Sequence, residues 1–135
     1  ALMLASNLDK KKFENICIID TNAKIGSKIK VSGGAKCNIT NELVTASNYL
    51  GDREFVAELL EKFSKNELLA FLNKNGVFPK INPKIVKGTY FCNSSQDVID
   101  MFTKLTTHVK KYLNTTVLDI DFDKHILKQL KQKKL

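Results

Sequence analysis

The spacing of apolar residues divides the beginning of the chain into a helix, a loop and a strand. Small and apolar residues dominate positions 1–8, which read as the later part of a helix, and the polar stretch DKKKFEN follows. Residues 16–19 are an uninterrupted apolar run closed by Asp20, a pattern typical of a buried strand in a parallel sheet. A helix, a short loop and a buried strand form the second half of a βαβ unit, so the sequence predicts an α/β fold.

Two amphipathic helices are predicted in the middle of the chain. The first, over residues 52–63, carries an apolar residue at every fourth position: Phe55, Leu59 and Phe63. That period is the one expected of a helix with one apolar face. Ser64 and Glu67 have the spacing of a capping box and open a second helix, which ends at Gly76. We expect the two helices to pack as a hairpin.

The last third of the chain predicts an α+β segment. Residues 77–91 contain both prolines and Gly88, which favours short strands and turns. Ser94 or Ser95 can cap a third helix. Its expected core face is formed by Val98, Phe102, Leu105, Val109 and Tyr112. Apolar and Asp residues then alternate over positions 118–123, which predicts a strand with one solvated face.

Composition narrows the class of protein. The 135 residues and the hydrophobic fraction of 43% suit one globular domain, and no apolar run approaches the ~20 residues that span a bilayer. Three widely spaced cysteines without a C-x-x-C pair favour neither a disulfide framework nor a zinc site, so we expect a reducing cytoplasm. The net charge of +8 suits nucleic acid or phosphate-bearing ligands, although a lysine-rich composition explains it equally well.

The segment IGSKIKVSGGAKCNITN, residues 25–41, combines backbone freedom with many hydrogen-bonding groups and no acidic side chain. We expect no regular element here, because the segment is polar and interrupted by glycines. Gly33 and Gly34 permit positive φ and close approach to a ligand, and the donors around them suit a pyrophosphate or the polar rim of a flavin. Most such loops are only turns. Cys37 is either a redox thiol activated by neighbouring lysines or, more commonly, an inert buried thiol.

Other candidate groups give weaker signals. Asp20, at the end of the buried strand, can accept two ribose hydroxyl donors or can cap a turn. His108 and His125 have no Ser, Cys or Asp partners in a triad pattern. The alternating Asp residues of positions 119–123 lack the glycine and distal Glu of a calcium loop, so we expect no metal site. No side chain is assigned as catalytic.

One resemblance is more particular. Residues 26–41, GSKIKVSGGAKCNITN, resemble the motif G-x-K-x-x-x-S-G-G-G-R-C-N-x-T-N of the aminoacetone oxidase-like FAD-binding proteins. This bacterial family of NAD(P)/FAD-dependent oxidoreductases has a glutathione-reductase-like FAD domain. The stretches ALMLASNL and NICIIDTN are similar to the helix after the family's glycine-rich turn and to its second strand. Residues 87–105 resemble a later family segment, more weakly.

The resemblance implies a set of cofactor-binding residues. Asp20 would contact the adenosine ribose of FAD. The residues implied to line the cofactor are Lys28, Ser32, Gly33, Gly34, Cys37, Asn38, Thr40 and Asn41. The chain also departs from the family: Asp20 replaces Glu, Ala35 replaces the third glycine, Lys36 replaces arginine, which removes a planar fork of donors, and Cys92 replaces proline.

The resemblance also implies a domain plan, in which the chain is the N-terminal portion of a longer oxidoreductase. Residues 1–45 would be a partial Rossmann-like FAD-binding domain, a βαβ unit lacking its first strand. Residues 46–92 would begin an inserted helical, substrate-side segment, and residues 93–135 would return to the FAD-binding domain. The missing strand would carry the G-x-G-x-x-G turn that holds the pyrophosphate, so we expect this portion alone to be inactive and to retain FAD poorly.

The partners expected of the complete protein are FAD, a nicotinamide nucleotide as reductant, and a small-molecule substrate that the sequence does not identify. The alternative is a basic, non-enzymatic module that binds nucleic acid through its lysines. The aromatic residues fall mostly on helical core faces instead of alternating with lysines as stacking platforms. We therefore favour the flavoprotein.

Overall fold

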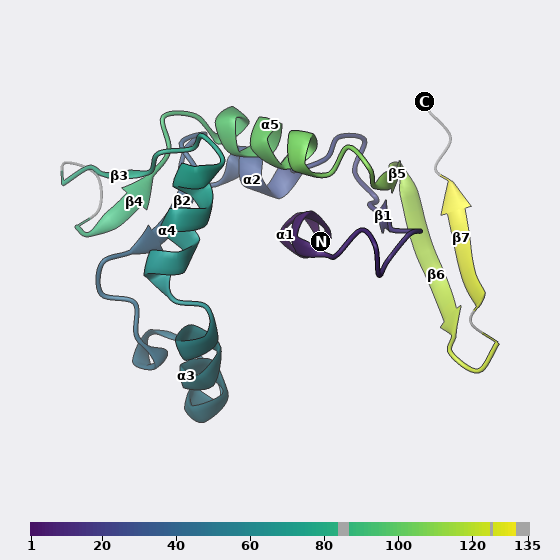
Figure 1. Ribbon diagram of the computed structural model, residues 1–135, viewed down its shortest axis with the longest axis horizontal. Coiled ribbons are helices and arrows are strands. Elements are labelled where there is room, and N and C mark those ends of the chain that lie inside the picture. Colours follow the sequence, from purple (N-terminus) through teal and green to yellow (C-terminus); the bar gives the residue numbers. More distant parts are fainter. Residues whose placement is uncertain (84–86, 125, 132–135) are drawn as a thin grey trace. The chain divides into compact units, whose positions relative to one another are not determined.

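The computed structural model describes residues 1–83, 87–124 and 126–131, which divide between two compact units (Figure 1). Unit 1 comprises Ala1–Ser27 and Phe102–Leu135, and unit 2 comprises Lys28–Met101. Unit 2 is thus inserted into the sequence of unit 1. Among the described residues, no helix has the length and apolar character needed to cross a membrane.

Unit 1 is built on a pair of parallel strands. Helix α1 (Leu2–Asn7) precedes strand β1 (Cys17–Ile19), which pairs with β5 (Lys110–Tyr112) in the register Ile18 to Lys111. Ala5 of α1 packs with Ile18 and Val109 in a small apolar core, to which Leu2, Ile16 and Ile25 add. The predicted helix, strand and parallel α/β arrangement are therefore confirmed, but the strand is only partly buried: Ile18 is buried, whereas Cys17 is exposed.

Unit 1 also contains a β-hairpin whose faces are more exposed than the alternation predicts. Strand β6 (Thr115–Asp121) pairs antiparallel with β7 (Ile126–Lys131). The predicted strand is present, but the expectation of one buried face was wrong: Leu118, Ile120 and Phe122 are 62%, 46% and 77% exposed. Alternation predicts which side chains share a face, whereas burial depends on a covering element, and these three side chains remain open to solvent in the described structure.

Unit 2 contains a three-stranded antiparallel sheet in the order β2-β4-β3. The strands are β2 (Asn38–Asn41), β3 (Lys80–Ile81) and β4 (Thr89–Phe91), and helix α2 (Ser27–Val31) precedes them. The short strands predicted over residues 77–91 are confirmed, although residues 84–86 lie outside the described part. The expectation of no regular element in residues 25–41 was wrong. Strand β2 forms because its backbone pairs with β4, a partner too distant in sequence to leave a local signal.

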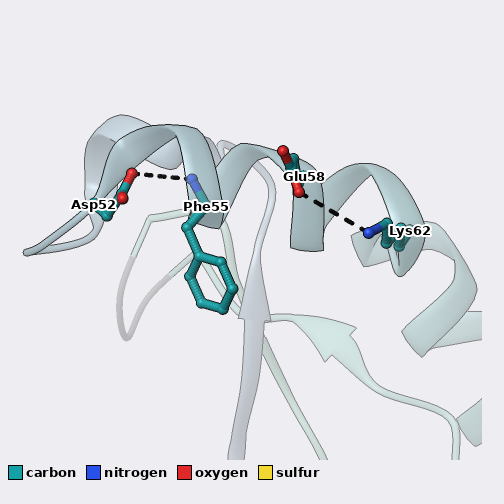
Figure 2. Close-up of polar contacts among 4 residues, drawn as sticks. All are labelled: Asp52, Phe55, Glu58 and Lys62. Atoms are coloured by element: carbon teal, nitrogen blue, oxygen red, sulfur yellow. Dashed lines mark hydrogen bonds and ion pairs between the residues drawn. The ribbon is translucent and has the colours of Figure 1, made fainter.

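Helices α3 (Arg53–Lys62) and α4 (Lys65–Lys74) confirm the two predicted amphipathic helices. Asp52 caps α3 by accepting hydrogen bonds from the backbone N–H groups of Glu54 and Phe55, at 3.0 and 3.1 Å. Figure 2 shows the bond from Phe55. Figure 2 also shows the exposed ion pair between Glu58 and Lys62, 3.9 Å apart on successive turns. Ser64 and Glu67 form the predicted capping box of α4.

The arrangement of these two helices differs from the expected hairpin. Only Phe63, with ψ of 88°, and the extended Ser64, with ψ of 165°, separate them. Helix α4 continues beyond the end of α3 instead of folding back beside it (Figure 1). Phe55, Leu59 and Phe63, the apolar stripe of α3, remain 46–59% exposed. A short turn, the 3₁₀ helix η1 (Ala46–Asn48), contacts α3.

Helix α5 (Ser95–Leu105) begins where predicted and ends earlier. The Ser94 hydroxyl accepts the backbone N–H of Gln96, so Ser94 is the cap. The helix does not reach Val109 and Tyr112, and placing them on its core face was wrong. Val109 is instead a buried residue just before β5, and Tyr112 lies in that strand. The helical spacing of apolar residues continues by chance beyond the end of α5 into β5, and β5 is a strand because it pairs with β1.

Candidate functional site

The most unusual backbone of the chain is a left-handed turn formed by residues 33–37. Gly33, Gly34 and Ala35 follow one another with φ of +57°, +60° and +68°, and Cys37 has φ of +56°. Two backbone hydrogen bonds close the turn: Lys36 N–H donates to the Gly33 carbonyl at 3.2 Å, and Cys37 N–H donates to the Ser32 carbonyl at 3.0 Å. Because left-handed backbone is unfavourable for residues with a Cβ, the turn explains why glycines are concentrated here.

The left-handed turn is fixed by the segment that opens α5. Cys92 N–H donates to the Lys36 carbonyl at 2.9 Å, and Ser95 N–H donates to the Ala35 carbonyl at 2.7 Å. The Ser95 hydroxyl also donates to the Lys30 carbonyl at 3.3 Å. These hydrogen bonds fix the backbone conformation of the turn without a ligand. Such preorganisation lowers the entropic cost of binding.

Gly33 and Gly34 serve different purposes within the turn. A Cβ at Gly33 would lie 2.0 Å from Asn38 Oδ1, whereas a Cβ at Gly34 would meet no atom within 4 Å. Gly33 thus permits the Asn38 side chain to lie against the backbone. Gly34 leaves an open stretch of exposed main chain, where a ligand can approach the backbone closely.

Asn41 already has a structural role at the far end of β2. Its Nδ2 group donates to the Lys87 carbonyl at 3.0 Å and to Thr89 Oγ1 at 3.1 Å, and its Oδ1 accepts the Leu43 N–H at 3.0 Å. The carboxamide therefore ties β2 to the start of β4. Its contact with a cofactor stays a prediction.

The cysteines next to the left-handed turn have the character of buried thiols. Cys37 and Cys92 are 6% and 4% exposed. Burial raises the pKa of Cys37 above its usual value, and burial, with smaller contributions from Cys37 and Asp97, raises the pKa of Cys92 to about 11. Both are protonated at neutral pH, which supports the inert thiol over an activated redox thiol.

Asp20 lies at the end of β1 in unit 1. Its Oδ1 accepts hydrogen bonds from the backbone N–H and side-chain Nδ2 of Asn22, at 2.8 and 2.7 Å, so it caps a turn. A carboxylate accepts about four hydrogen bonds, and the two from Asn22 leave capacity for ribose hydroxyls. The interpretation of Asp20 as a turn cap is confirmed, and its ribose contact remains a prediction.

The remaining predicted residues belong to unit 2 with the left-handed turn. Lys28 is exposed on α2, while Ser32 and Thr40 are half-buried at the start of the turn and in β2. The structure brings together the residues of the motif from Ser32 to Asn41, whereas Asp20 belongs to the other unit. No cluster of metal-ligating side chains occurs within the described ranges.

Sequence reasoning missed the residues that position the turn. Cys92 and Ser95 act mainly through backbone N–H groups, which any residue except proline supplies. This also accounts for the departure at position 92. The cysteine retains an N–H that a proline would lack, and here that N–H is bonded to the Lys36 carbonyl. The weak likeness of residues 87–105 to a family segment was the only available signal.

Comparisons with known proteins identify the family. The sequence profile described as "HI0933-like protein Rossmann domain" matches residues 1–135. The ribosomal RNA dihydrouridine synthase of Escherichia coli is 33% identical over 101 residues, 73% of this chain and 24% of that protein. The 3-dehydro-bile acid delta(4,6)-reductase of Clostridium scindens is 39% identical over 66 residues, 48% of this chain and 16% of that protein. The chain thus spans a quarter or less of these relatives, and it belongs to the HI0933-like Rossmann-domain family of FAD-binding oxidoreductases.

Proposed function

We propose that this chain supplies one wall of the FAD site in a larger FAD-dependent reductase. The observation that carries the proposal is the left-handed turn: an open stretch of main chain at Gly34, held rigid by Cys92 and Ser95, within the motif that resembles a flavoprotein signature. When bound, FAD would supply the redox chemistry, while the protein positions the cofactor and excludes water.

The residues of the site fit such a cofactor. Gly34 leaves room beside the backbone, and the exposed Asn38 side chain, which lies against Gly33, presents a carboxamide with both donor and acceptor groups. Asp20 retains acceptor capacity for a ribose diol. Cys37, the last residue of the turn, is a buried, neutral thiol, and we propose no electron transfer through it.

The direction of the reaction is proposed from the relatives. One is named as a dihydrouridine synthase and the other as a delta(4,6)-reductase; the first name describes a reduced product and the second a reduction. We therefore propose reduction of an unsaturated substrate in the cytoplasm, with a nicotinamide nucleotide as reductant, in place of an aminoacetone oxidase activity.

The experiment replaces Asn38 by alanine in the complete protein and measures flavin occupancy by the absorption band near about 450 nm that oxidised flavins show. We expect lower occupancy and weaker FAD affinity, because the carboxamide next to Gly33 and Gly34 is removed. Asn73→Ala is the matched control, since Asn73 is an exposed residue of α4 away from the turn. Unchanged occupancy in folded Asn38→Ala would show that the motif is not at the cofactor.

A second candidate concerns the substrate. The net charge of +8 and the similarity to a ribosomal RNA dihydrouridine synthase favour RNA as the molecule that such a reductase acts on. Retention of the complete protein on RNA should then fall steeply with salt. Salt-dependent retention without any bound flavin, even after FAD is added, would instead favour the non-enzymatic nucleic-acid module.

A further inference from the structure

Unit 2 has a surface pocket that lies beside the left-handed turn and involves none of the residues assigned above to the flavin. Its volume is about 300 Å³, the lower end of the range for small-molecule sites. Its polar lining consists of Lys36, Lys80, Asn82 and Asn93, and Phe91 and Cys92 contribute buried surface. The pocket is large enough for one small polar group of a ligand.

The two lysines reach the pocket from elements with fixed backbones. Lys36 belongs to the left-handed turn, and its carbonyl accepts the Cys92 N–H at 2.9 Å. Lys80 lies in β3, where it is paired with Phe91 of β4. The same strand β4 pairs with β2 on its other side, at Asn38. Backbone hydrogen bonds to Phe91 and Cys92 therefore bring Lys36 and Lys80, which are far apart in sequence, to the same short segment of the chain.

The charge of the pocket is unbalanced. No Asp or Glu is among the residues lining it in the described part of the chain. Asp97 acts electrostatically on the neighbouring Cys92 thiol, yet lies outside the lining. An anion bound beside these two lysines would be attracted by both and, among the described residues, would meet no lining carboxylate that repels it. Asn93 adds an uncharged amide group to the lining, and an amide donor suits one of the several oxygens of a phosphoryl group.

We propose that this pocket is a phosphoryl-binding site, separate from the flavin site, with Lys36 and Lys80 as its charged ligands. The phosphoryl group belongs to a free mononucleotide or to an RNA backbone, both of which present the same tetrahedral anion. Lys36 belongs to the left-handed turn that we propose as a wall of the FAD site, whereas Lys80 does not, so the test compares binding with and without FAD.

The test titrates the complete protein calorimetrically with inorganic phosphate, with uridine monophosphate and with a short oligouridine, each in the presence and absence of excess FAD. In Lys36→Gln and Lys80→Gln we expect affinity for the best of these probes to fall at least about tenfold, the effect of losing a charge-assisted contact. Lys74→Gln is the matched control, because Lys74 is an exposed lysine of α4 in the same unit that does not line the pocket.

Each outcome decides the proposal. Tightest binding of uridine monophosphate supports a mononucleotide site, and tightest binding of the oligouridine, still sensitive to Lys36 and Lys80, supports an RNA backbone site. Equal weakening by Lys74→Gln would reveal only general charge attraction and overturn the proposal. So would the absence of binding by all three probes, or binding that excess FAD abolishes, since the pocket would then be part of the flavin site. If the complete protein binds FAD but none of the three phosphoryl probes, the phosphoryl site is refuted and the proposed FAD-dependent function is not.

Discussion

Replacement of Ala35 by glycine should stabilise the protein. Ala35 has φ of +68°, and a residue with a Cβ in the left-handed region costs about 1–2 kcal/mol. The Ala35 side chain is exposed, so its methyl group gives up little packing when it is removed. Position 35 is also where the resembling family motif has a glycine, as the backbone conformation requires.

The expected gain is smaller than the relieved strain. Glycine increases the conformational entropy of the unfolded chain, which offsets about 0.4–1 kcal/mol. The net stabilisation should therefore be about 0.5–1 kcal/mol, or a rise in melting temperature of roughly 1–4 °C for a protein of this size or larger. Urea unfolding monitored by circular dichroism should show a higher midpoint with an unchanged slope.

The matched control is the reverse substitution at the neighbouring position. Gly34 has φ of +60°, and an added Cβ there would meet no atom within 4 Å. Gly34→Ala should therefore introduce the backbone strain alone and destabilise by about the same 0.5–1 kcal/mol. A lower midpoint for Ala35→Gly, or no change for Gly34→Ala, would refute the assignment of a strained left-handed turn at these positions.

Three further predictions concern neighbouring features. Gly33→Ala should destabilise more than Gly34→Ala, because its Cβ would displace the Asn38 side chain, 2.0 Å away at Oδ1, and would also lie 3.0 Å from the Asn38 backbone nitrogen. Equal urea midpoints for the two variants would contradict this. The pKa of Cys92 rises from 9.0 to about 11 on folding, so the unfolded chain loses the thiol proton at a lower pH than the folded chain does. The free energy of unfolding should therefore fall as the pH rises from about 9 to about 11. We expect this pH dependence of the urea midpoint to diminish in Cys92→Ala. Ser64→Ala should lower the thermal unfolding midpoint by removing about 1 kcal/mol of helix capping, since the hydroxyl accepts the Glu67 N–H; an unchanged midpoint would show that the cap of α4 adds nothing.

Local signals in the sequence predicted the elements that local interactions define. The capping box at Ser64 and Glu67 depends on groups three residues apart and predicted the start of α4, and the apolar period of residues 52–63 predicted α3. Strand β2 and the early end of α5 were missed, because each depends on pairing with a distant strand. The period of the apolar residues correctly predicted α3, but it does not predict whether another element covers that apolar face, and the face is exposed.

The candidate site was predictable to a similar degree. The glycines and the flavoprotein-like motif indicated a special backbone in residues 33–37, and the positive φ values bear out that use of Gly33 and Gly34. The anchoring by Cys92 and Ser95 was not predictable, because it uses main-chain donors. The convergence of Lys36 and Lys80 was hidden for the same reason, since strand pairing produces it.

The insertion of unit 2 within unit 1 sets an order of events during protein synthesis. Strand β1 leaves the ribosome early, yet its parallel partner β5 emerges only after all of Lys28–Met101 has been translated. Unit 2 is contiguous in sequence and can form its sheet while the chain is still growing. A nascent chain whose residues have left the ribosome as far as Met101, but not as far as Lys110, would therefore contain the left-handed turn in its final setting, while Ile18 would still lack the strand that completes its parallel pair.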